Sequence, residues 1–328
     1  MAAPSISLVT TANAAIGTGH LRRCLALADA LRQAGSTLRF FVVEGDPALC
    51  DWVRPYADAM AISRDLTLPS ALAQAGVDPL VVVDSYAVRA DQTQRLLNGN
   101  TRVLVMDDLV DRPLPATWLL NSCVADAERY AGLTHATLLM GPRYALLRAQ
   151  FRNLPRRSPS GPVRRVLLTF GGSDVLRLAD RVVNLFASFA GPLEIRLVAG
   201  RLAGTGALHA GPHRIDVLHD VAHMADLMTW ADLAVATAGQ TIFELAATGC
   251  PAICLQVADN QRYTGELCRR IGSAEIRDAR RVTDRELVEL IRNLLNDPIR
   301  RAAMSRAGQA AVDGLGAMRV SDVLLEAA

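Results

Sequence analysis

Short runs of consecutive apolar residues alternate along the chain with longer stretches whose apolar residues recur at helical spacing. The first run, Ile6–Val9, is followed by a stretch in which Leu21, Cys24 and Leu27 share one helical face, and Gly35 is a typical helix stop. Continuous apolar strands between amphipathic helices predict a parallel sheet covered on both faces. Further strands are expected in the first half at Leu38–Val43, Leu80–Asp84, Val103–Asp107, Leu119–Asn121 and Leu138–Gly141.

Residues 152–164 interrupt this alternation with a cluster of Pro, Ser, Gly and Arg that is typical of a linker. The alternation restarts at Val166–Phe170 and continues to the last helical stretches. We therefore predict an α/β fold of two doubly wound, Rossmann-like domains, 1–151 and 165–328, that face each other across a cleft. Ligands of such sheets bind outside the carboxyl ends of the strands, so loops from both domains are expected to line the site.

Composition and charge exclude several functions. The chain has 328 residues, and its 35 basic and 33 acidic side chains leave a net charge of +2, too balanced for nucleic acid or an anionic membrane as the main partner. Every basic residue is Arg, which excludes a catalytic lysine, a Schiff base and a P-loop lysine. No apolar run approaches the ~18 residues of a membrane span, and the first residues lack a basic leader. We expect a cytoplasmic protein with buried free thiols.

The first strand leads into Gly17-Thr18-Gly19-His20, which opens the first helix. The two glycines let a ligand approach the backbone, and a helix N-terminus favours an anion. The third glycine of the dinucleotide fingerprint would fall on Arg22, which disfavours a nicotinamide cofactor. His20 at this junction could act as a general base near neutral pH or could simply cap the helix.

Two further loops place acids at the same edge of the predicted sheet. Asp84 and Asp107 end apolar strands, where they could orient a histidine, hold sugar hydroxyls, bind a metal or cap the following turns. His219 and His223 have the spacing of a zinc helix, but Val217–Asp220 is typical of a strand end and loop. We therefore predict no metal.

The second half carries three candidate loops. Gly171-Gly172-Ser173 follows its first strand and could form a phosphate nest. The turn 239–241 meets a helix whose Glu244 could accept both hydroxyls of a ribose, or could only favour the helix dipole. Residues 259–261 could bind sugar hydroxyls or merely start the next helix.

Seven segments in order carry a more specific signal than any single loop: GTGHLRRCLALADAL, VVDSY, VMDDL, GPRYALLRAQF, LLTFGGSD, ATAGQTIFELAATGCP and ADNQ. Together they resemble the UDP-2,4-diacetamido-2,4,6-trideoxy-β-L-altropyranose hydrolases of pseudaminic acid biosynthesis. The resemblance runs from about residue 5 to about residue 275. A broader relative is the peptidoglycan N-acetylglucosaminyltransferase, which shares the GT-B fold.

The resemblance implies inverting hydrolysis of a UDP-linked diacetamido trideoxy sugar. His20 would deprotonate the water that attacks the anomeric carbon, and the sugar C1–O bond would break without a metal or another cofactor. The implied substrate-binding residues are Gly17, Gly19, Asp84, Tyr86, Tyr144, Asn260 and Gln261. The implied nucleotide-binding residues are Gly171, Gly172, Ser173, Leu218, His219, Gly239, Gln240, Thr241 and Glu244. Val9 and Thr11 stand where the family usually has Arg and Asp, a difference that concerns the sugar more than the reaction.

Three other functions fit parts of the same pattern. A GT-B glycosyltransferase would use the same cleft with an acceptor hydroxyl in place of water. A sugar-nucleotide-binding protein without activity and a nicotinamide oxidoreductase are the remaining alternatives. We expect a UDP-sugar as the partner, no nucleic acid or membrane, and a monomer or weak homodimer. By analogy with GT-B proteins, the last helix would pack back on the N-terminal domain.

Overall fold

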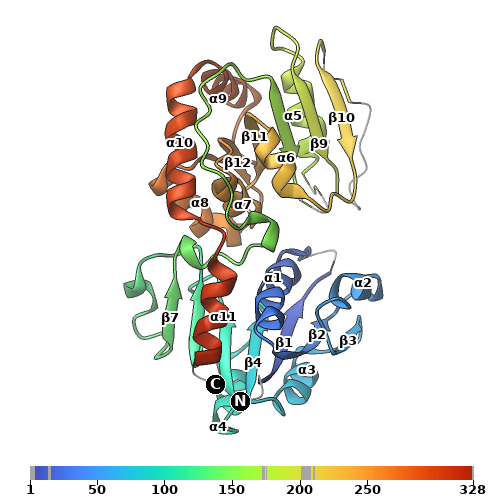
Figure 1. The fold of residues 1–328 in the computed structure, drawn as a ribbon, viewed down its shortest axis with the longest axis vertical. Coiled ribbons are helices and arrows are strands. Elements are labelled where there is room, and N and C mark those ends of the chain that lie inside the picture. The colour runs from blue at the N-terminus through green and yellow to red at the C-terminus, as the bar shows by residue number, and fades with distance from the viewer. Residues whose placement is uncertain are drawn as a thin grey trace. The chain divides into compact units, whose positions relative to one another are not determined.

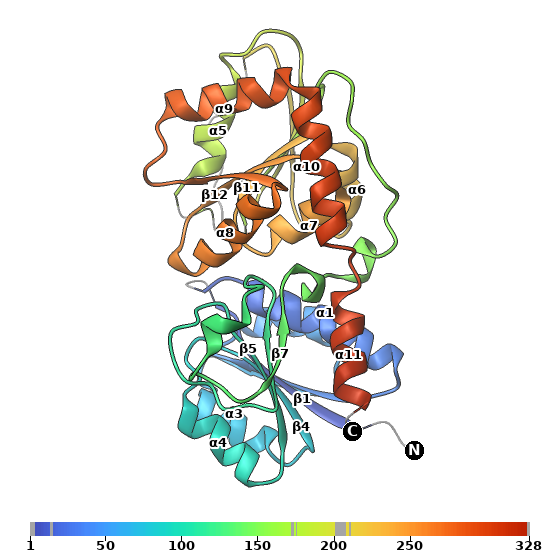
Figure 2. The same cartoon turned by 90° about the vertical axis from the view of Figure 1, so that its left-hand side faces the viewer.

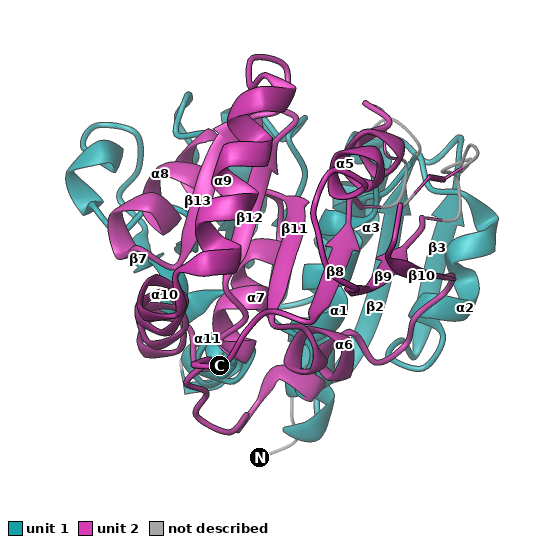
Figure 3. Ribbon diagram, turned by 90° about the horizontal axis from the view of Figure 1, so that it is seen from above, with its two compact units in different colours: residues 1–149, 314–328 teal, residues 150–313 magenta. Residues whose placement is uncertain are grey.

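The computed structural model describes residues 4–13, 16–171, 174, 176–200, 208–209 and 211–326 (Figure 1). The chain divides into two compact units, residues 1–149 with 314–328 and residues 150–313 (Figure 3). Each unit has one parallel sheet with helices on both faces, which confirms the predicted pair of Rossmann-like domains.

The sheet of the first unit has the strand order β3-β2-β1-β4-β5-β6-β7 within the described residues, and every neighbouring pair is parallel. The chain therefore moves outward from β1 in one direction, then returns and moves outward from β4 in the other. The strands are β1 (Ser5–Thr11), β2 (Thr37–Val43), β3 (Ala59–Ser63), β4 (Leu80–Asp84), β5 (Arg102–Met106), β6 (Trp118–Asn121) and β7 (Thr137–Met140).

The central strands of this sheet are buried on both faces, which explains their unbroken apolar runs. Ile6 and Leu8 of β1 belong to the core beneath α1 and α11, whereas Val9 belongs to the core beneath α3 and α4. Figure 2 shows α1 and α11 on one side of the sheet and α3 and α4 on the other. The helices are α1 (Gly19–Gln33), α2 (Cys50–Val53), α3 (Leu68–Ala75), α4 (Ala90–Asn98) and α11 (Gly316–Glu326).

The C-terminal helix α11 is part of the first unit and packs along α1. Its apolar residues Ala317, Val320 and Leu324 are buried in the core that α1 shares. Gly316 begins the helix against the carbonyl of Ala145, where any Cβ would clash with the backbone. The last helix thus closes over a sheet formed by the first 149 residues.

The second unit repeats the same plan in six described strands, with the order β10-β9-β8-β11-β12-β13 and parallel pairing throughout. The order reverses between β8 and β11, as it does between β1 and β4 in the first unit. The strands are β8 (Arg165–Thr169), β9 (Glu194–Val198), β10 (Arg214–Leu218), β11 (Leu233–Thr237), β12 (Ala252–Gln256) and β13 (Ala274–Asp278).

Helices α5 and α9 cover one face of this second sheet, and α6 and α7 cover the other (Figure 3). The capping box of Thr283 and Glu286 fixes the start of α9. The helices are α5 (Leu178–Phe186), α6 (Met224–Trp230), α7 (Thr241–Thr248), α8 (Arg262–Ile271), α9 (Asp284–Asn296) and α10 (Pro298–Ala311). None of the described helices is long and apolar enough to cross a membrane.

Residues 152–164, predicted as a linker, contain no helix or strand but belong to the second unit. Arg157 ties this segment down because its Nη1 donates to the carbonyl of Met228 at 3.1 Å and its backbone N–H to Gln309 Oε1 at 2.9 Å. Val163 is buried in the core of the same unit. The compact part of the second unit therefore begins at Gln150.

Candidate functional site

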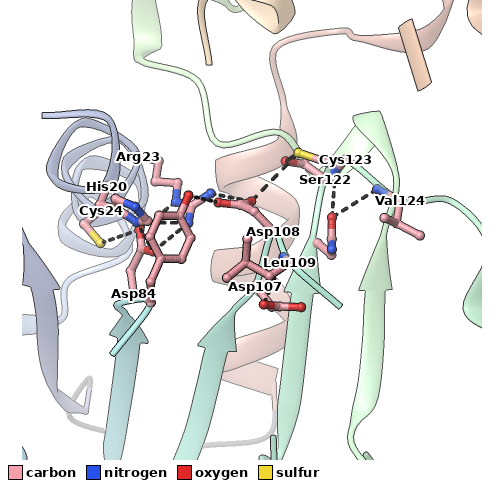
Figure 4. Close-up of polar contacts among 12 residues, drawn as sticks. His20, Arg23, Cys24, Asp84, Asp107, Asp108, Leu109, Ser122, Cys123 and Val124 are labelled. Carbon is pink, nitrogen blue, oxygen red and sulfur yellow. Dashed lines mark hydrogen bonds and ion pairs between the residues drawn. The ribbon is translucent and has the colours of Figure 1, made fainter. Parts of the chain in front are cut away.

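The loops at the strand-order reversal of the first unit bring His20 and Asp84 together. His20 is the second residue of α1, which follows β1, and Asp84 is the last residue of β4. Their side chains are 5% and 0% exposed, and His20 Nδ1 lies 2.6 Å from Asp84 Oδ1 (Figure 4). A carboxylate can only accept, so Nδ1 carries the proton of this bond. In the neutral imidazole, Nε2 is then the basic nitrogen.

Arg23, absent from the predicted site residues, is the centre of this cluster. It lies three residues after His20 on α1 and is 8% exposed. Its Nε and Nη2 donate to the two oxygens of Asp84, each at 2.6 Å, and its Nη1 donates to Asp108 Oδ1 at 2.8 Å. The fork geometry of a guanidinium allows it to join two carboxylates in this way. The i, i+3 spacing of His20 and Arg23 within GHLRR was the available signal.

These contacts fix the charges of the cluster. Burial alone would raise the pKa of Asp84, but the charge of Arg23 and the hydrogen bonds from Arg23 and His20 hold that pKa well below its usual range. Burial would lower the pKa of Arg23, yet Asp108 and Asp84 raise it well above the usual value. Burial and the Asp84 charge also raise the pKa of Cys24, whose Sγ lies 3.7 Å from Asp84 Oδ2. Cys24 is therefore a thiol, not a thiolate nucleophile, at neutral pH.

Tyr86 completes the surroundings of His20. Its ring meets the imidazole edge-on, with ring centroids 4.4 Å apart, and its hydroxyl donates to Asp108 Oδ2 at 3.1 Å. Asp108 is buried beside Cys123, whose Sγ lies 3.8 Å from Asp108 Oδ1. The structure thus brings the predicted residues His20, Asp84 and Tyr86 into one group.

Asp107 has a different role from its neighbour Asp108. It accepts hydrogen bonds from the backbone N–H groups of Leu109 and Val110, at 3.2 and 2.9 Å, and from the Tyr130 hydroxyl at 2.6 Å. Of the roles considered for Asp107, the structure therefore shows turn capping.

The remaining predicted residues of the first unit lie apart from these contacts. Gly17 has a φ of +81° and donates its N–H to the carbonyl of Asn13 at 2.8 Å, which closes the loop before α1. Gly19 is the first residue of α1, and a Cβ at either glycine would meet no atom within 4 Å. There is therefore space beside the backbone at both positions among the described residues. Tyr144 instead packs against the core shared by α1 and α11.

In the second unit, the loops after β8 and β11 lie close together. Gly171 follows β8 with a φ of +82°, and a Cβ on it would lie 4.0 Å from Oγ1 of Thr237, the last residue of β11. Gly172 and Ser173 lie outside the described residues. Asp174 accepts the N–H groups of Leu178 and Ala179 at 2.8 and 2.9 Å and so fixes the start of α5.

The turn before α7 gathers most of the other predicted residues. Gly239 and Gln240 precede the helix, Thr241 begins it, and the side chain of Gln240 does not cap it. Glu244 lies half-buried on the first turn. Gln261 Oε1 accepts the N–H of Val257 at 2.9 Å, and its Nε2 lies 3.7 Å from the position of a Cβ on Gly239.

The other predicted residues of this unit occupy two separate places. Asn260 shares a short 3₁₀ helix, Asp259–Gln261, with Gln261. Leu218 ends β10, and its carbonyl accepts the N–H of Ala199 at 2.9 Å. The exposed His219 follows, and β9 and β8 lie between this strand and β11. Within the described part of the chain, no three His, Cys, Asp or Glu side chains form a group that could hold a metal ion.

Comparison with known proteins finds a family similar to part of the second unit. Residues 202–316 match the glycosyltransferase family 28 C-terminal domain. A UDP-N-acetylglucosamine–N-acetylmuramyl-(pentapeptide) pyrophosphoryl-undecaprenol N-acetylglucosamine transferase of Acidiphilium cryptum is 32% identical over 184 residues, 53% of this chain and 50% of the relative. An uncharacterised protein of Methanocaldococcus jannaschii is 23% identical over 278 residues, 78% of this chain and 56% of the relative. The matches span about half the length of these curated relatives.

The fold has solved counterparts along its whole length. The crystal structure of Acinetobacter baumannii MurG superposes with a TM-score of 0.72 at 17% identity, over 99% of this chain and 100% of that one. At this identity the likeness establishes the fold, which is the GT-B glycosyltransferase fold.

The prediction of a nucleotide-sugar hydrolase is wrong. The matched family domain and the curated relatives with a named activity are glycosyltransferases, and the comparisons do not support the hydrolase family of pseudaminic acid biosynthesis. A hydrolase and a transferase of this fold differ in the group that attacks the sugar. In a hydrolase it is water, and in a transferase it is a hydroxyl of the acceptor. The motifs that carried the resemblance therefore did not distinguish the two reactions.

Proposed function

We propose that this protein is an inverting glycosyltransferase that moves a sugar from a UDP-linked donor to a hydroxyl of an acceptor. The observation that carries the proposal is the buried pair of His20 and Asp84 at the strand-order reversal of the first unit. It occurs in a chain whose second unit matches a glycosyltransferase domain. UDP-N-acetylglucosamine is the first donor to test because it is named in the activity of the curated relatives.

His20 acts in this proposal as the general base. Its Nδ1 is engaged with Asp84, so Nε2 takes the proton from the acceptor hydroxyl as the oxygen attacks the anomeric carbon. The bond between the anomeric carbon and the diphosphate oxygen breaks, and UDP leaves from the opposite face, which inverts the configuration. Asp84 stabilises the imidazolium that forms. Tyr86, Gly17 and Gly19 border the reacting sugar.

The second unit holds the donor. The turn of Gly239, Gln240 and Thr241 offers backbone N–H groups and the N-terminus of α7 to the diphosphate, as Gly171 does after β8. Glu244 accepts the ribose hydroxyls. Leu218 and His219 border the uracil, and Asn260 and Gln261 contact the sugar.

The test is a transfer assay with UDP-N-acetylglucosamine and a panel of glycoside acceptors with free hydroxyls, followed by mass spectrometry and NMR. We expect UDP release that depends on the acceptor, and a product whose new glycosidic bond has the configuration opposite to the donor. UDP release at the same rate without acceptor, with free sugar as the product, would contradict the proposal. Retention of configuration would contradict the role of His20.

A further inference from the structure

His20 and four neighbouring side chains form a closed circuit of contacts. Asp84 binds both His20 and Arg23, Arg23 binds Asp108, Asp108 accepts the Tyr86 hydroxyl, and the Tyr86 ring packs on His20. Figure 4 shows His20, Arg23, Asp84 and Asp108 of this circuit. Asp108 is thus joined to the base through Arg23 and Tyr86.

The charges in this circuit do not balance while His20 is neutral. Asp84 and Asp108 carry two negative charges, and Arg23 carries one positive charge. One negative charge therefore remains unmatched in a buried site, where pairing matters most. Uptake of a proton by His20 supplies the missing positive charge. Without Asp108, Arg23 alone would neutralise Asp84, and a proton on His20 would add an unmatched charge.

We propose that Asp108 is a positioning residue that matches the charge of Arg23 and so leaves the Asp84 carboxylate to support a protonated His20. This inference rests on the proposed role of His20 as the base. The Arg23 Nη2 atom lies 3.2 Å from His20 Nδ1, and both donate to the same oxygen of Asp84. The two cations therefore compete for one carboxylate, and Asp108 draws one of them toward itself.

The charged and titratable groups of this cluster come from three elements. Arg23, Asp84 and Tyr86 contact His20 itself, whereas Cys24 contacts Asp84, and Asp108 contacts Arg23 and Tyr86. Arg23 and Cys24 belong to α1, Asp84 ends β4 and is followed by Tyr86, and Asp108 follows β5. Burial and Asp84 keep Cys24 protonated at neutral pH, so its thiol adds no charge. The balance is therefore set by Arg23 and the two carboxylates.

The experiment is an NMR titration of nitrogen-labelled histidine side chains in the full chain, with the His20 signal assigned by its loss in His20→Gln. In Asp108→Asn, which keeps an acceptor oxygen for Arg23, we expect the His20 midpoint to fall by roughly one pH unit or more relative to wild type. The matched control is Asp107→Asn, a buried aspartate one residue away that contacts Tyr130. A general charge effect would shift the His20 midpoint equally in both variants, and that result would overturn the proposal.

A second variant tests the direction in which the His20 midpoint moves. Arg23→Gln removes the competing cation, so the His20 midpoint should rise. If Arg23→Gln does not fold, the comparison of Asp108→Asn with Asp107→Asn still decides the question. An unchanged midpoint in Asp108→Asn overturns the inference. Because the titration needs no substrate, a failed transfer assay with a shifted midpoint would refute the proposed reaction while leaving the charge balance in place.

Where transfer is observed, kinetics give an independent readout. The acid limb of kcat/KM should move to lower pH in Asp108→Asn and stay in place in Asp107→Asn, because only Asp108 contacts Arg23. A fall in kcat/KM of equal size at every pH would indicate a merely structural role.

Discussion

The two units have the same sheet topology but place different chemistry at the edge where their strand order reverses. In the first unit, His20, Arg23 and Asp84 are buried and hold one another through charged hydrogen bonds. In the second unit, the same edge has glycine turns and half-buried polar side chains such as Glu244. A buried charge costs least when it is paired, as Arg23 and Asp84 are here, whereas half-buried groups can exchange water for a ligand. In the function that we propose, the first edge carries the proton transfer and the second binds the donor.

The largest expected effect separates these two roles. His20→Gln removes the base, so kcat should fall roughly 10²–10⁴-fold, the usual contribution of a general base. The affinity for UDP should not change, because our proposal assigns nucleotide binding to the second unit. Steady-state kinetics and calorimetric titration with UDP measure the two quantities.

A matched control for that prediction is His135→Gln, which changes a histidine of the same unit outside the cluster. It should leave kcat within twofold of wild type. If His20→Gln retained full turnover, or if its affinity for UDP fell by the same factor as kcat, the division of roles between the units would be wrong.

The next effect concerns stability in the first unit. Asp84→Asn weakens the buried hydrogen bonds from Arg23 and His20 and should lower the free energy of unfolding by about 1.5–3 kcal/mol, although Arg23 keeps its ion pair with Asp108. Hydrogen exchange followed by mass spectrometry should show the loss in peptides from α1 and β4. Peptides from β11 and β12 in the second unit should keep their protection. Uniform loss across both units would argue against a local ion-pair cluster.

The stability difference should also depend on pH, with a sign fixed by the Asp84 pKa. The folded pKa lies well below that of an unfolded aspartate, roughly 3.9. The carboxylate therefore contributes its full stability above that value and loses it as the pH falls toward the folded pKa. Acid unfolding curves of wild type and Asp84→Asn should converge below about pH 4. A gap that widened on acidification would contradict the assigned charge state.

The same contrast explains what the sequence could predict. The central strands β1, β4 and β5 are buried on both faces, so their apolar runs predicted them and the polar residues at their ends. The edge strands β3 and β13 were not predicted, because half-exposed positions carry mixed residues and leave no continuous apolar run.

Arg23 was missed for a related reason. An arginine in an amphipathic helix is typical of the solvent face, whereas this one is buried against carboxylates 61 and 85 residues away in sequence. Asp84 was visible as a strand-end acid and Asp108 as part of the VMDDL segment, but nothing local in the sequence joins them to α1. The prediction of hydrolysis failed because a general base can deprotonate either water or an acceptor hydroxyl, so the residues around it do not distinguish the two.

The smallest expected effect sharpens the assignment of the second unit. Glu244→Ala should weaken UDP binding roughly tenfold, the loss of a charged hydrogen bond to the ribose, and should leave folding intact because Glu244 is half-buried at a helix start. The discriminating measurement is the ratio of affinities for UDP and 2′-deoxy-UDP. Wild type should prefer UDP, and Glu244→Ala should lose most of that preference. Glu289→Ala, an exposed change on α9 in the same unit, should keep the wild-type ratio. If Glu244→Ala also keeps the ratio, Glu244 only favours the helix dipole, and the ribose must be held elsewhere.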